Sequence, residues 1–285
     1  MSPPWQNVAI VGVGLLGGSL GLALRERKLA ATVTGIGRDA QRLRMAVERG
    51  VISKYSTDLM SGVADADLVV LCTPVSLIAS QLGDVYQATQ DDCLITDVGS
   101  TKAQIVSAAD ALDTTRFVGS HPLAGSEQTG FEHARADLFE NRLVIVTPSN
   151  RPSQLDDQAT AVNRIRSFWE SVGAHVQQMP ADQHDRLLAT TSHLPHLIAA
   201  ALSAMLKPDE FPLTGTGWRD TTRIAAGDAE LWRQIIAANR EAVVVAMQRF
   251  GQQWQQLQAA IENDNPMALM SILEQGKQNR ESLGS

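Results

Sequence analysis

Three glycines near the N-terminus are the first residues whose spacing indicates a specific chemistry. Gly12, Gly14 and Gly17 form a Gly-x-Gly-x-x-Gly motif between an apolar run and a helical stretch. Leu15 and Leu16, inside the motif, belong to the same predicted site. In such a motif the first glycine makes a tight turn, the second lets the backbone approach a pyrophosphate, and the third lets helix and strand pack closely. Because the positive end of the helix then faces the phosphates, the motif predicts a dinucleotide cofactor.

The residues after the second expected strand bear on which dinucleotide binds. An acidic residue about 20 positions past the motif commonly binds the ribose hydroxyls of NAD. Here the position reads Gly37, Arg38, Asp39. A planar arginine cation suits the 2′-phosphate of NADP, so we expect NADP to be favoured over NAD. The alternative is that Asp39 takes the place of the acid and Arg38 is only a solvated side chain.

Polar residues also come at or just past the ends of later expected strands: Thr73, Ser100 and His121. Ligands of doubly wound sheets bind beyond the carboxyl ends of the strands, so we expect these residues to converge at the nicotinamide end of the cleft. His121 is the candidate general base, because histidine accepts protons near neutral pH. Ser100 is a candidate for hydrogen bonding to a hydroxyl group, or it is only a helix N-cap. Thr73 and Pro74 either position the backbone beside the cofactor or form a simple turn.

Two further histidines, His193 and His196, are three residues apart, so on a helix they share a face. That spacing also suits metal ligands. However, the stretch 184–196 contains no glutamate and its only acid is Asp185, and both cysteines are distant in sequence. We therefore expect no metal here.

The elements that must position these residues follow from the hydrophobic pattern. Short β-rich runs alternate with helical stretches, and several runs are continuously apolar, which is typical of strands covered on both faces. The candidate strands span 8–12, 32–37, 67–72, 93–99, 116–120, 142–148 and 174–179. This alternation predicts an α/β fold with a doubly wound, Rossmann-type parallel sheet. We assign residues 1–180 to this dinucleotide-binding domain.

After about residue 180 the strand pattern ends, and residues 181–285 are predicted to form a helical domain. An Ala/Leu-rich stretch covers 182–206, and a turn rich in Pro and Gly covers 207–217. A long helical segment then runs from 228 to about 263 and carries more apolar residues than one core-facing stripe needs. These side chains either pack on the sheet domain or form the interface of a homodimer, and we favour the homodimer.

The amino-acid composition limits the kinds of molecule that the protein is expected to bind. The formal net charge is −7, which argues against nucleic acid or an anionic membrane, because phosphate contacts need clustered Lys and Arg. Cys72 and Cys93 lie in apolar runs and do not make a disulfide framework, so we expect a reducing, cytoplasmic location. The N-terminal apolar run ends at Gly12 without a basic segment before it, unlike a signal peptide or a membrane span.

Several stretches together resemble the prephenate/arogenate dehydrogenases of tyrosine biosynthesis. The resemblance runs in order over about residues 8–250. Besides the glycine motif it rests on TDVGSTK (96–102), GSHPLAGSEQTGF (119–131), HDRLLATTSHLPH (184–196) and GWRDTTRIAAGDAELW (217–232). It implies an NAD(P)-dependent oxidative decarboxylation, with hydride transfer to the cofactor and aromatisation of the ring.

The resemblance also implies roles for individual residues. His121 would accept a hydrogen bond from the ring hydroxyl of the substrate. Arg223 would bind the side-chain carboxylate, with Arg219 as the alternative four residues earlier. The remaining substrate-binding candidates are His193, His196, Glu127 and Trp232, although Trp232 could also be core.

Alternatives remain open at this stage. Prephenate and arogenate differ by a keto or an amino group on the side chain, and we favour prephenate, with 4-hydroxyphenylpyruvate as the product. Another dehydrogenase with a Rossmann domain and a helical tail would share the glycine motif but lack the HPLAGSE and SHLPH stretches. A non-enzymatic dinucleotide sensor would not need His121, Ser100 and Arg223 together.

Overall fold

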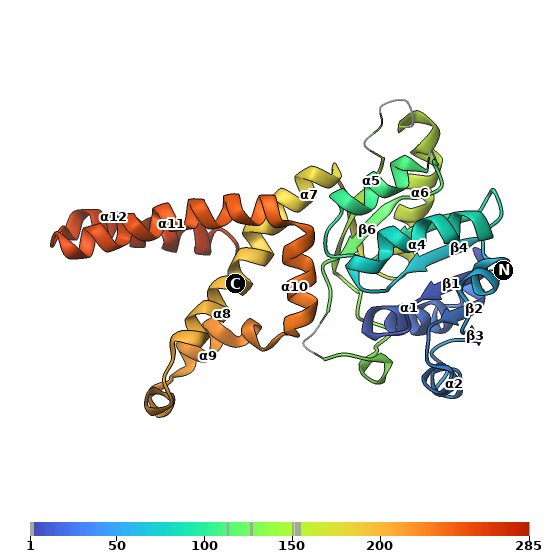
Figure 1. The fold of residues 1–285 in the computed structure, drawn as a ribbon, viewed down its shortest axis with the longest axis horizontal. Coiled ribbons are helices and arrows are strands. Elements are labelled where there is room, and N and C mark those ends of the chain that lie inside the picture. Colours follow the sequence, from blue (N-terminus) through green and yellow to red (C-terminus); the bar gives the residue numbers. More distant parts are fainter. Residues whose placement is uncertain (1–2, 113, 126–127, 150, 152–154, 285) are drawn as a thin grey trace.

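The computed structural model describes residues 3–112, 114–125, 128–149, 151 and 155–284, and its first half is built on a parallel sheet (Figure 1). The strand order is β3-β2-β1-β4-β5, and every neighbouring pair is parallel. The strands are β1 (Trp5–Val11), β2 (Ala30–Ile36), β3 (Lys54–Ser56), β4 (Leu68–Leu71) and β5 (Leu94–Asp97). The order reverses direction between β1 and β4, which is the place where doubly wound sheets bind ligands.

Helices cover both faces of this sheet, so the apolar strands are buried on both sides. On one face lie α1 (Leu15–Glu26), α2 (Ala40–Glu48) and α6 (Leu155–Ser171). On the other lie α3 (Leu59–Val63), α4 (Val75–Ala88) and α5 (Ala103–Ala111). All four residues of β4, LVVL, are buried, as the continuous apolar run predicts.

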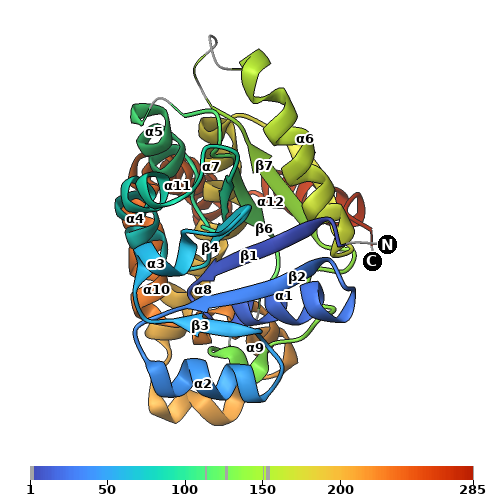
Figure 2. The ribbon, with the colours of Figure 1, turned by 90° about the vertical axis from the view of Figure 1, so that its right-hand side faces the viewer.

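A second, smaller sheet follows (Figure 2). It has the order β6-β7-β8, with β6 (Gly119–Pro122), β7 (Leu143–Thr147) and β8 (His175–Gln178). β6 and β7 are antiparallel, whereas β7 and β8 are parallel. A single bridge between Ile95 and Phe117 connects β5 to the segment before β6. The start of the strand predicted at 116–120 thus lies parallel to β5, whereas β6 and β7 form an antiparallel pair in a separate sheet, which hydrophobic pattern could not reveal because it does not report strand direction.

The rest of the chain is helical. A continuous path runs through α7 (Ala181–Leu188), a π-helical turn (Ala189–His193) and α8 (Leu194–Met205). It is followed by short 3₁₀ turns at Pro208–Leu213 and Arg223–Ala226, which flank α9 (Thr216–Thr222). The long segment predicted from 228 is broken at Asn239 into α10 (Ala229–Ala238) and α11 (Arg240–Glu262). The last helix is α12 (Pro266–Glu281).

Helices α11 and α12 lie side by side and project away from the sheets as an arm (Figure 1). Helices α7 and α10 pack against the sheet region and connect the arm to it. Ile235 of α10 joins the core formed with α4, and Ser76 Oγ donates to Gln234 Oε1 at 2.8 Å. Among the described residues, no helix is both long enough and apolar enough to span a membrane.

The predicted fold class, a Rossmann-type sheet followed by a helical region, is confirmed. β3 was missed because it is only three residues long and none of its residues is fully buried. The division into domains at 180/181 stays a prediction, although β8 ends at Gln178 and α7 begins at Ala181.

Candidate active site

The glycine motif lies at the point where the strand order reverses. Gly12 follows β1 with φ +97°, a conformation that strains any other residue. A Cβ atom there would meet the backbone of Cys72, just after β4, at 2.8 Å. A Cβ atom on Gly17 would lie 2.2 Å from the carbonyl oxygen of Gly12, so only glycine lets α1 approach β1 this closely.

The N-terminus of α1 fits a pyrophosphate. The cap residue is Gly14, which has no side chain to bond the first-turn amides, and a Cβ atom at this position would meet nothing within 4 Å. The amide groups around Leu15 and Leu16 are thus left for an anion, and the first turn carries no acidic residue. These features match the three separate glycine roles of a dinucleotide site.

The loop after β2 bears on the alternatives left open for the cofactor. Arg38 is exposed. Asp39 is the N-cap of α2, and its Oδ1 atom accepts hydrogen bonds from the amides of Gln41 at 2.9 Å and Arg42 at 3.1 Å. Its carboxylate is therefore engaged by its own helix.

Thr73 and Pro74 lie where predicted, between β4 and α4. Pro74 is the N-cap of α4, and Thr73 Oγ1 donates to Gln81 Oε1 of the same helix at 2.7 Å. The contact of Gly12 with the backbone at Cys72 places this turn beside the glycine loop. Thr73 and Pro74 thus form the turn from β4 into α4, next to the glycine loop.

His121 is the third residue of β6, rather than lying just past a strand end as expected. It pairs with Ile145 across the antiparallel ladder, and it is buried, with 8% of its surface exposed. From the sequence we predicted that this strand ends at Ser120, because a histidine followed by proline is typical of the end of a strand.

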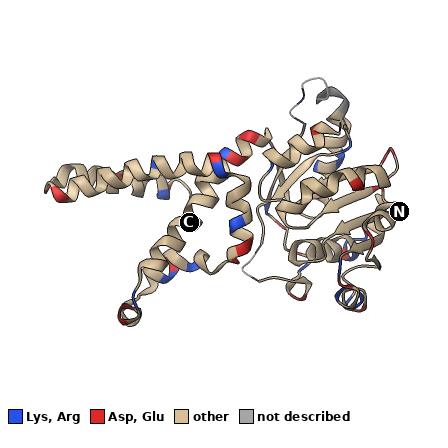
Figure 3. Cartoon of the chain, in the orientation of Figure 1, with Lys and Arg blue, Asp and Glu red and all other residues tan. Residues whose placement is uncertain are grey.

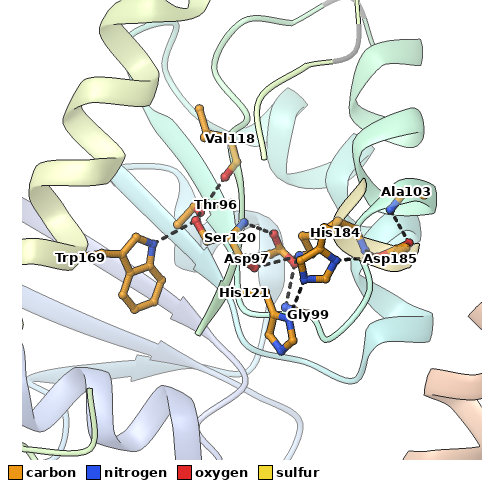
Figure 4. Close-up of polar contacts among 11 residues, drawn as sticks. Thr96, Asp97, Gly99, Ala103, Val118, Ser120, His121, Trp169, His184 and Asp185 are labelled. Atoms are coloured by element: carbon orange, nitrogen blue, oxygen red, sulfur yellow. Dashed lines mark hydrogen bonds and ion pairs between the residues drawn. The ribbon is translucent and has the colours of Figure 1, made fainter. Parts of the chain in front are cut away.

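A chain of hydrogen bonds leads from His121 to a buried carboxylate (Figure 4). His121 Nδ1 lies 2.8 Å from His184 Nε2, and His184 Nδ1 lies 2.7 Å from Asp185 Oδ1. Both partners belong to α7, so the helical region contributes directly to the environment of His121.

The direction of these bonds follows from the carboxylate. The Asp185 carboxylate only accepts, so His184 Nδ1 donates to it. In neutral His184 the Nε2 atom is then an acceptor, and His121 Nδ1 must donate to that atom. This leaves Nε2 of His121 unprotonated, with a lone pair ready to accept a hydrogen bond.

Burial holds His121 in its neutral form. The pKa of His121 lies well below 6.5, first because the ring is removed from water and then because positive charge on His184, Lys102 or His193 would repel its protonated form. Burial also lowers the pKa of His193 to about 4. Both rings are neutral at physiological pH.

The Asp185 carboxylate also caps a helix of the sheet region. It accepts from the backbone N–H groups of Lys102 at 2.8 Å and Ala103 at 2.9 Å, at the start of α5. Lys102 is the N-cap of that helix, so Ser100 is not, and the N-cap alternative for Ser100 was wrong. Ser100 lies partly exposed in the segment between β5 and α5.

His184 and Asp185 were missed as site residues. The sequence showed them only as neighbours in a helical stretch, where Asp185 was noted as its one acidic residue. Their spacing from His121, 63 residues for His184, carries no local pattern that could reveal the contact.

Three of the substrate-binding candidates, His193, His196 and Trp232, lie together in one cluster. The His196 ring stacks on Trp232 with 3.6 Å between ring centroids, and His193 meets Trp232 edge-on at 6.3 Å. Gly227 packs against the same indole, where a Cβ atom would lie 2.7 Å from Nε1. Asn239 links the cluster to α7, because its amide donates to the Asp185 carbonyl at 2.7 Å and lies 3.2 Å from His193 Nδ1.

The remaining candidates are less constrained. Arg223 begins the 3₁₀ turn that ends next to Gly227, and it is exposed, as is Arg219 on α9. Glu127 lies outside the described residues. In the part of the chain that the structure describes, no group of three or more His, Cys, Asp or Glu residues could hold a metal ion.

Comparison with known proteins agrees with this geometry. Residues 20–178 match the family model for "Prephenate dehydrogenase, nucleotide-binding domain", and residues 180–275 match that for "Prephenate dehydrogenase, dimerization domain". The prephenate dehydrogenase of Bacillus subtilis is 30% identical over 98% of this chain and 76% of its own length.

Solved structures give the same result. A prephenate dehydrogenase from A. aeolicus, in complex with hydroxyphenyl propionate and NAD+, has a TM-score of 0.90 and 31% identity over 98% of both chains. The arogenate dehydrogenase of Synechocystis has a TM-score of 0.82 and 30% identity over 98% of this chain and 100% of its own. The chain belongs to the prephenate dehydrogenase family of nicotinamide-dependent oxidoreductases.

Proposed function

We propose that this enzyme oxidises and decarboxylates prephenate to 4-hydroxyphenylpyruvate, with His121 as the acceptor for the ring hydroxyl proton. The observation that carries this proposal is the chain of contacts Asp185–His184–His121. With His184 neutral, this chain makes His121 Nδ1 the donor and leaves Nε2 as the acceptor. A bound nicotinamide cofactor supplies the hydride acceptor. His121 supplies what the cofactor does not, a base aimed at the hydroxyl group.

The chemistry needs such an acceptor. Hydride leaves the carbinol carbon, and the oxygen on that carbon becomes more acidic as carbonyl character develops. By accepting the hydroxyl proton, His121 stabilises this change. The electron pair of the bond to the ring carboxylate then closes the aromatic ring as carbon dioxide leaves. The proton returns to the oxygen, which is a phenol in the product, so His121 ends in its starting state.

The helical region would bind the rest of the substrate. Prephenate carries two carboxylates, and an acidic protein needs a local cation for them. Arg223 can hold the side-chain carboxylate through two parallel bonds. The Nδ1 atom of His196 is buried without a hydrogen-bond partner among the described residues, so it can bond a polar group of the substrate against the Trp232 wall. Ser100 can bond the ring hydroxyl or the nicotinamide ribose.

Arogenate is the alternative substrate, because only the keto or amino group of the side chain differs. Prephenate is favoured as the more common activity in bacteria. Initial rates with both substrates decide between them.

We further propose that NADP is preferred over NAD. Gly37 offers no carboxylate to the ribose, and Asp39 caps α2, so the exposed Arg38 is the group placed for a 2′-phosphate. NAD+ is the cofactor in the A. aeolicus relative, so both must be compared.

We propose that the protein is a homodimer through the arm of α11 and α12. Large apolar side chains are exposed along it: Val244, Val245, Met247, Phe250, Trp254, Ile261, Met267, Met270 and Leu273. No charged residue lies between Arg249 and Glu262, and the arm is correspondingly sparse in charge (Figure 3). Such an apolar surface is typical of an interface, and the matched family model is named for dimerization.

Free Cys72 and Cys93 support a reducing, cytoplasmic location.

The role of His121 can be tested by His121→Asn, which keeps a donor toward His184 but removes the proton acceptor. We expect kcat to fall by about 10²–10⁴-fold with cofactor affinity unchanged. In the unmodified enzyme the neutral ring is active, so kcat/KM should stay level from neutral pH down to 6.5 and fall only at lower pH, through the lowered pKa. A variant with near-normal kcat would remove His121 from the mechanism.

Arg223→Ala should raise KM strongly with a smaller effect on kcat, because the side-chain carboxylate is bound alike in the ground and transition states. Losing this pair should cost about 2–5 kcal/mol. Arg219→Ala is the matched control, since it removes an equally exposed cation four residues away. If only the control raises KM, the carboxylate site is at Arg219.

Arg38→Ala should weaken binding of NADP and leave that of NAD almost unchanged, whereas Gly37→Asp should shift preference toward NAD. Arg44→Ala, which removes an exposed cation from α2, is the control. Titration of both cofactors measures the effect. A wild-type preference for NAD would contradict this interpretation of the loop.

Sedimentation at micromolar concentration should give a dimer. Trp254→Glu, on the exposed face of the arm, should shift the protein toward monomer because it buries a charge in the interface. Met60→Glu, on α3 of the sheet region, should leave the dimer intact. A wild-type monomer would refute the proposal.

A further inference from the structure

A charged pair is buried beside the catalytic histidine, and the reaction described above does not use it. Asp97 ends β5, and Lys102 precedes α5 as its N-cap. Lys102 Nζ bonds Asp97 Oδ2, and neither side chain has any exposed surface.

The pair holds the residue that precedes His121. Asp97 Oδ1 accepts from the backbone N–H of Ser120 at 2.9 Å, and Lys102 Nζ donates to the Ser120 carbonyl at 2.9 Å. β6 is an edge strand of its sheet, so the polar groups of Ser120 that face away from β7 would otherwise lack partners. The ion pair thus replaces a neighbouring strand at the position next to His121.

The contacts close into a ring. The backbone N–H of Lys102 donates to Asp185 Oδ1, and Asp185 holds His184, which holds His121. From His121 the path continues through Ser120 back to Asp97 and Lys102. Asp97 Oδ2 also accepts from the amide of Gly99 at 2.8 Å, which ties in the residue before Ser100.

Stability alone is a weak reason for such a pair. Removing two charges from water is costly, and apolar residues of similar volume often stabilise a core as well or better. The contacts with Ser120 give a more specific reason. We propose that Asp97 and Lys102 are positioning residues for His121: they fix β6 so that the ring meets His184 and the substrate at once, and they set the charge around it. This inference rests on the proposed role of His121.

The electrostatic surroundings of His121 support the second part of the proposal, that the pair sets the charge around this ring. The groups that face or adjoin His121 are His184 and Asp185 of α7, His193 of the π-helical turn, and the pair Asp97 and Lys102. The cation of Lys102 is one cause of the low pKa of His121, after burial and His184. Removing that cation while Asp97 stays should raise the pKa of the His121 ring.

The test compares Lys102→Met, the double variant Asp97→Asn with Lys102→Met, and Val106→Ala. Val106 is a buried apolar residue of α5 close to the same strands, so its truncation destabilises the region without changing a charge. For each protein we would measure kcat, KM, the pH dependence of kcat/KM, histidine ¹⁵N signals by NMR, and unfolding by denaturant.

We expect Lys102→Met to lower kcat by about 10- to 100-fold, the effect of displacing a reacting group by a fraction of an ångström to one ångström. Its acid limb of kcat/KM, and the titration of His121 seen by NMR, should move to higher pH. The double variant should regain stability, because no unpaired charge remains, yet kcat should stay low, because methionine cannot bond the Ser120 carbonyl. Val106→Ala should lose stability but keep kcat and the pH profile.

Two results would overturn the inference. One is a Lys102→Met enzyme with kcat within about threefold of wild type and an unmoved acid limb, well under the loss expected from displacement. The other is an equal loss of kcat in Val106→Ala, which would make the effect purely structural. If Lys102→Met does not fold, the double variant decides, and normal kcat there refutes the proposal. Normal kcat in His121→Asn would instead refute the proposed function.

Discussion

The ring nitrogen of a histidine that is free to accept a proton is set by the hydrogen bond that the other nitrogen makes. For His121, the proposed base, that bond is made to His184, which Asp185 holds in turn. The same carboxylate accepts two backbone amides at the start of α5 and so attaches the helical region to the sheet region. One acidic side chain therefore sets both the docking of the two regions and the protonation of the base. The site cannot be assembled without the docking.

The second sheet explains how His121 meets the helical region. Were β6 simply the next parallel strand, only its last residues would lie at the carboxyl edge of the sheet. Instead it turns back against β7, and its residues alternate between two surroundings. Ser120 Oγ lies 2.8 Å from Thr96 Oγ1 and accepts from Trp169 Nε1 at 3.0 Å, inside the core, whereas the next residue meets the helices at His184. A slip of one residue along β7 would exchange these two surroundings.

Sequence reasoning succeeded where a short motif carries its own geometry. The glycine loop and the turn after β4 are local patterns, and the structure places both between a strand and a helix, as expected. It failed where the answer depended on pairing between distant segments. The direction of β6, the break at Asn239 and the contact between His121 and His184 arise from tertiary packing, which leaves no periodic signal. Arg38 and Arg223 are exposed, so only a bound ligand will show what they contact.

The packing at Gly227 has a consequence for the proposed substrate-binding cluster. A Cβ atom at this position would lie 2.7 Å from Trp232 Nε1 and 3.4 Å from His196 Cε1, so the glycine lies close to both stacked rings and leaves no room for a methyl group. Any larger residue there must tilt the indole, and the stacked imidazole must move with it. The position of both rings thus depends on the absence of a side chain at residue 227. A substitution there would move the proposed substrate-binding cluster without replacing any of its polar groups.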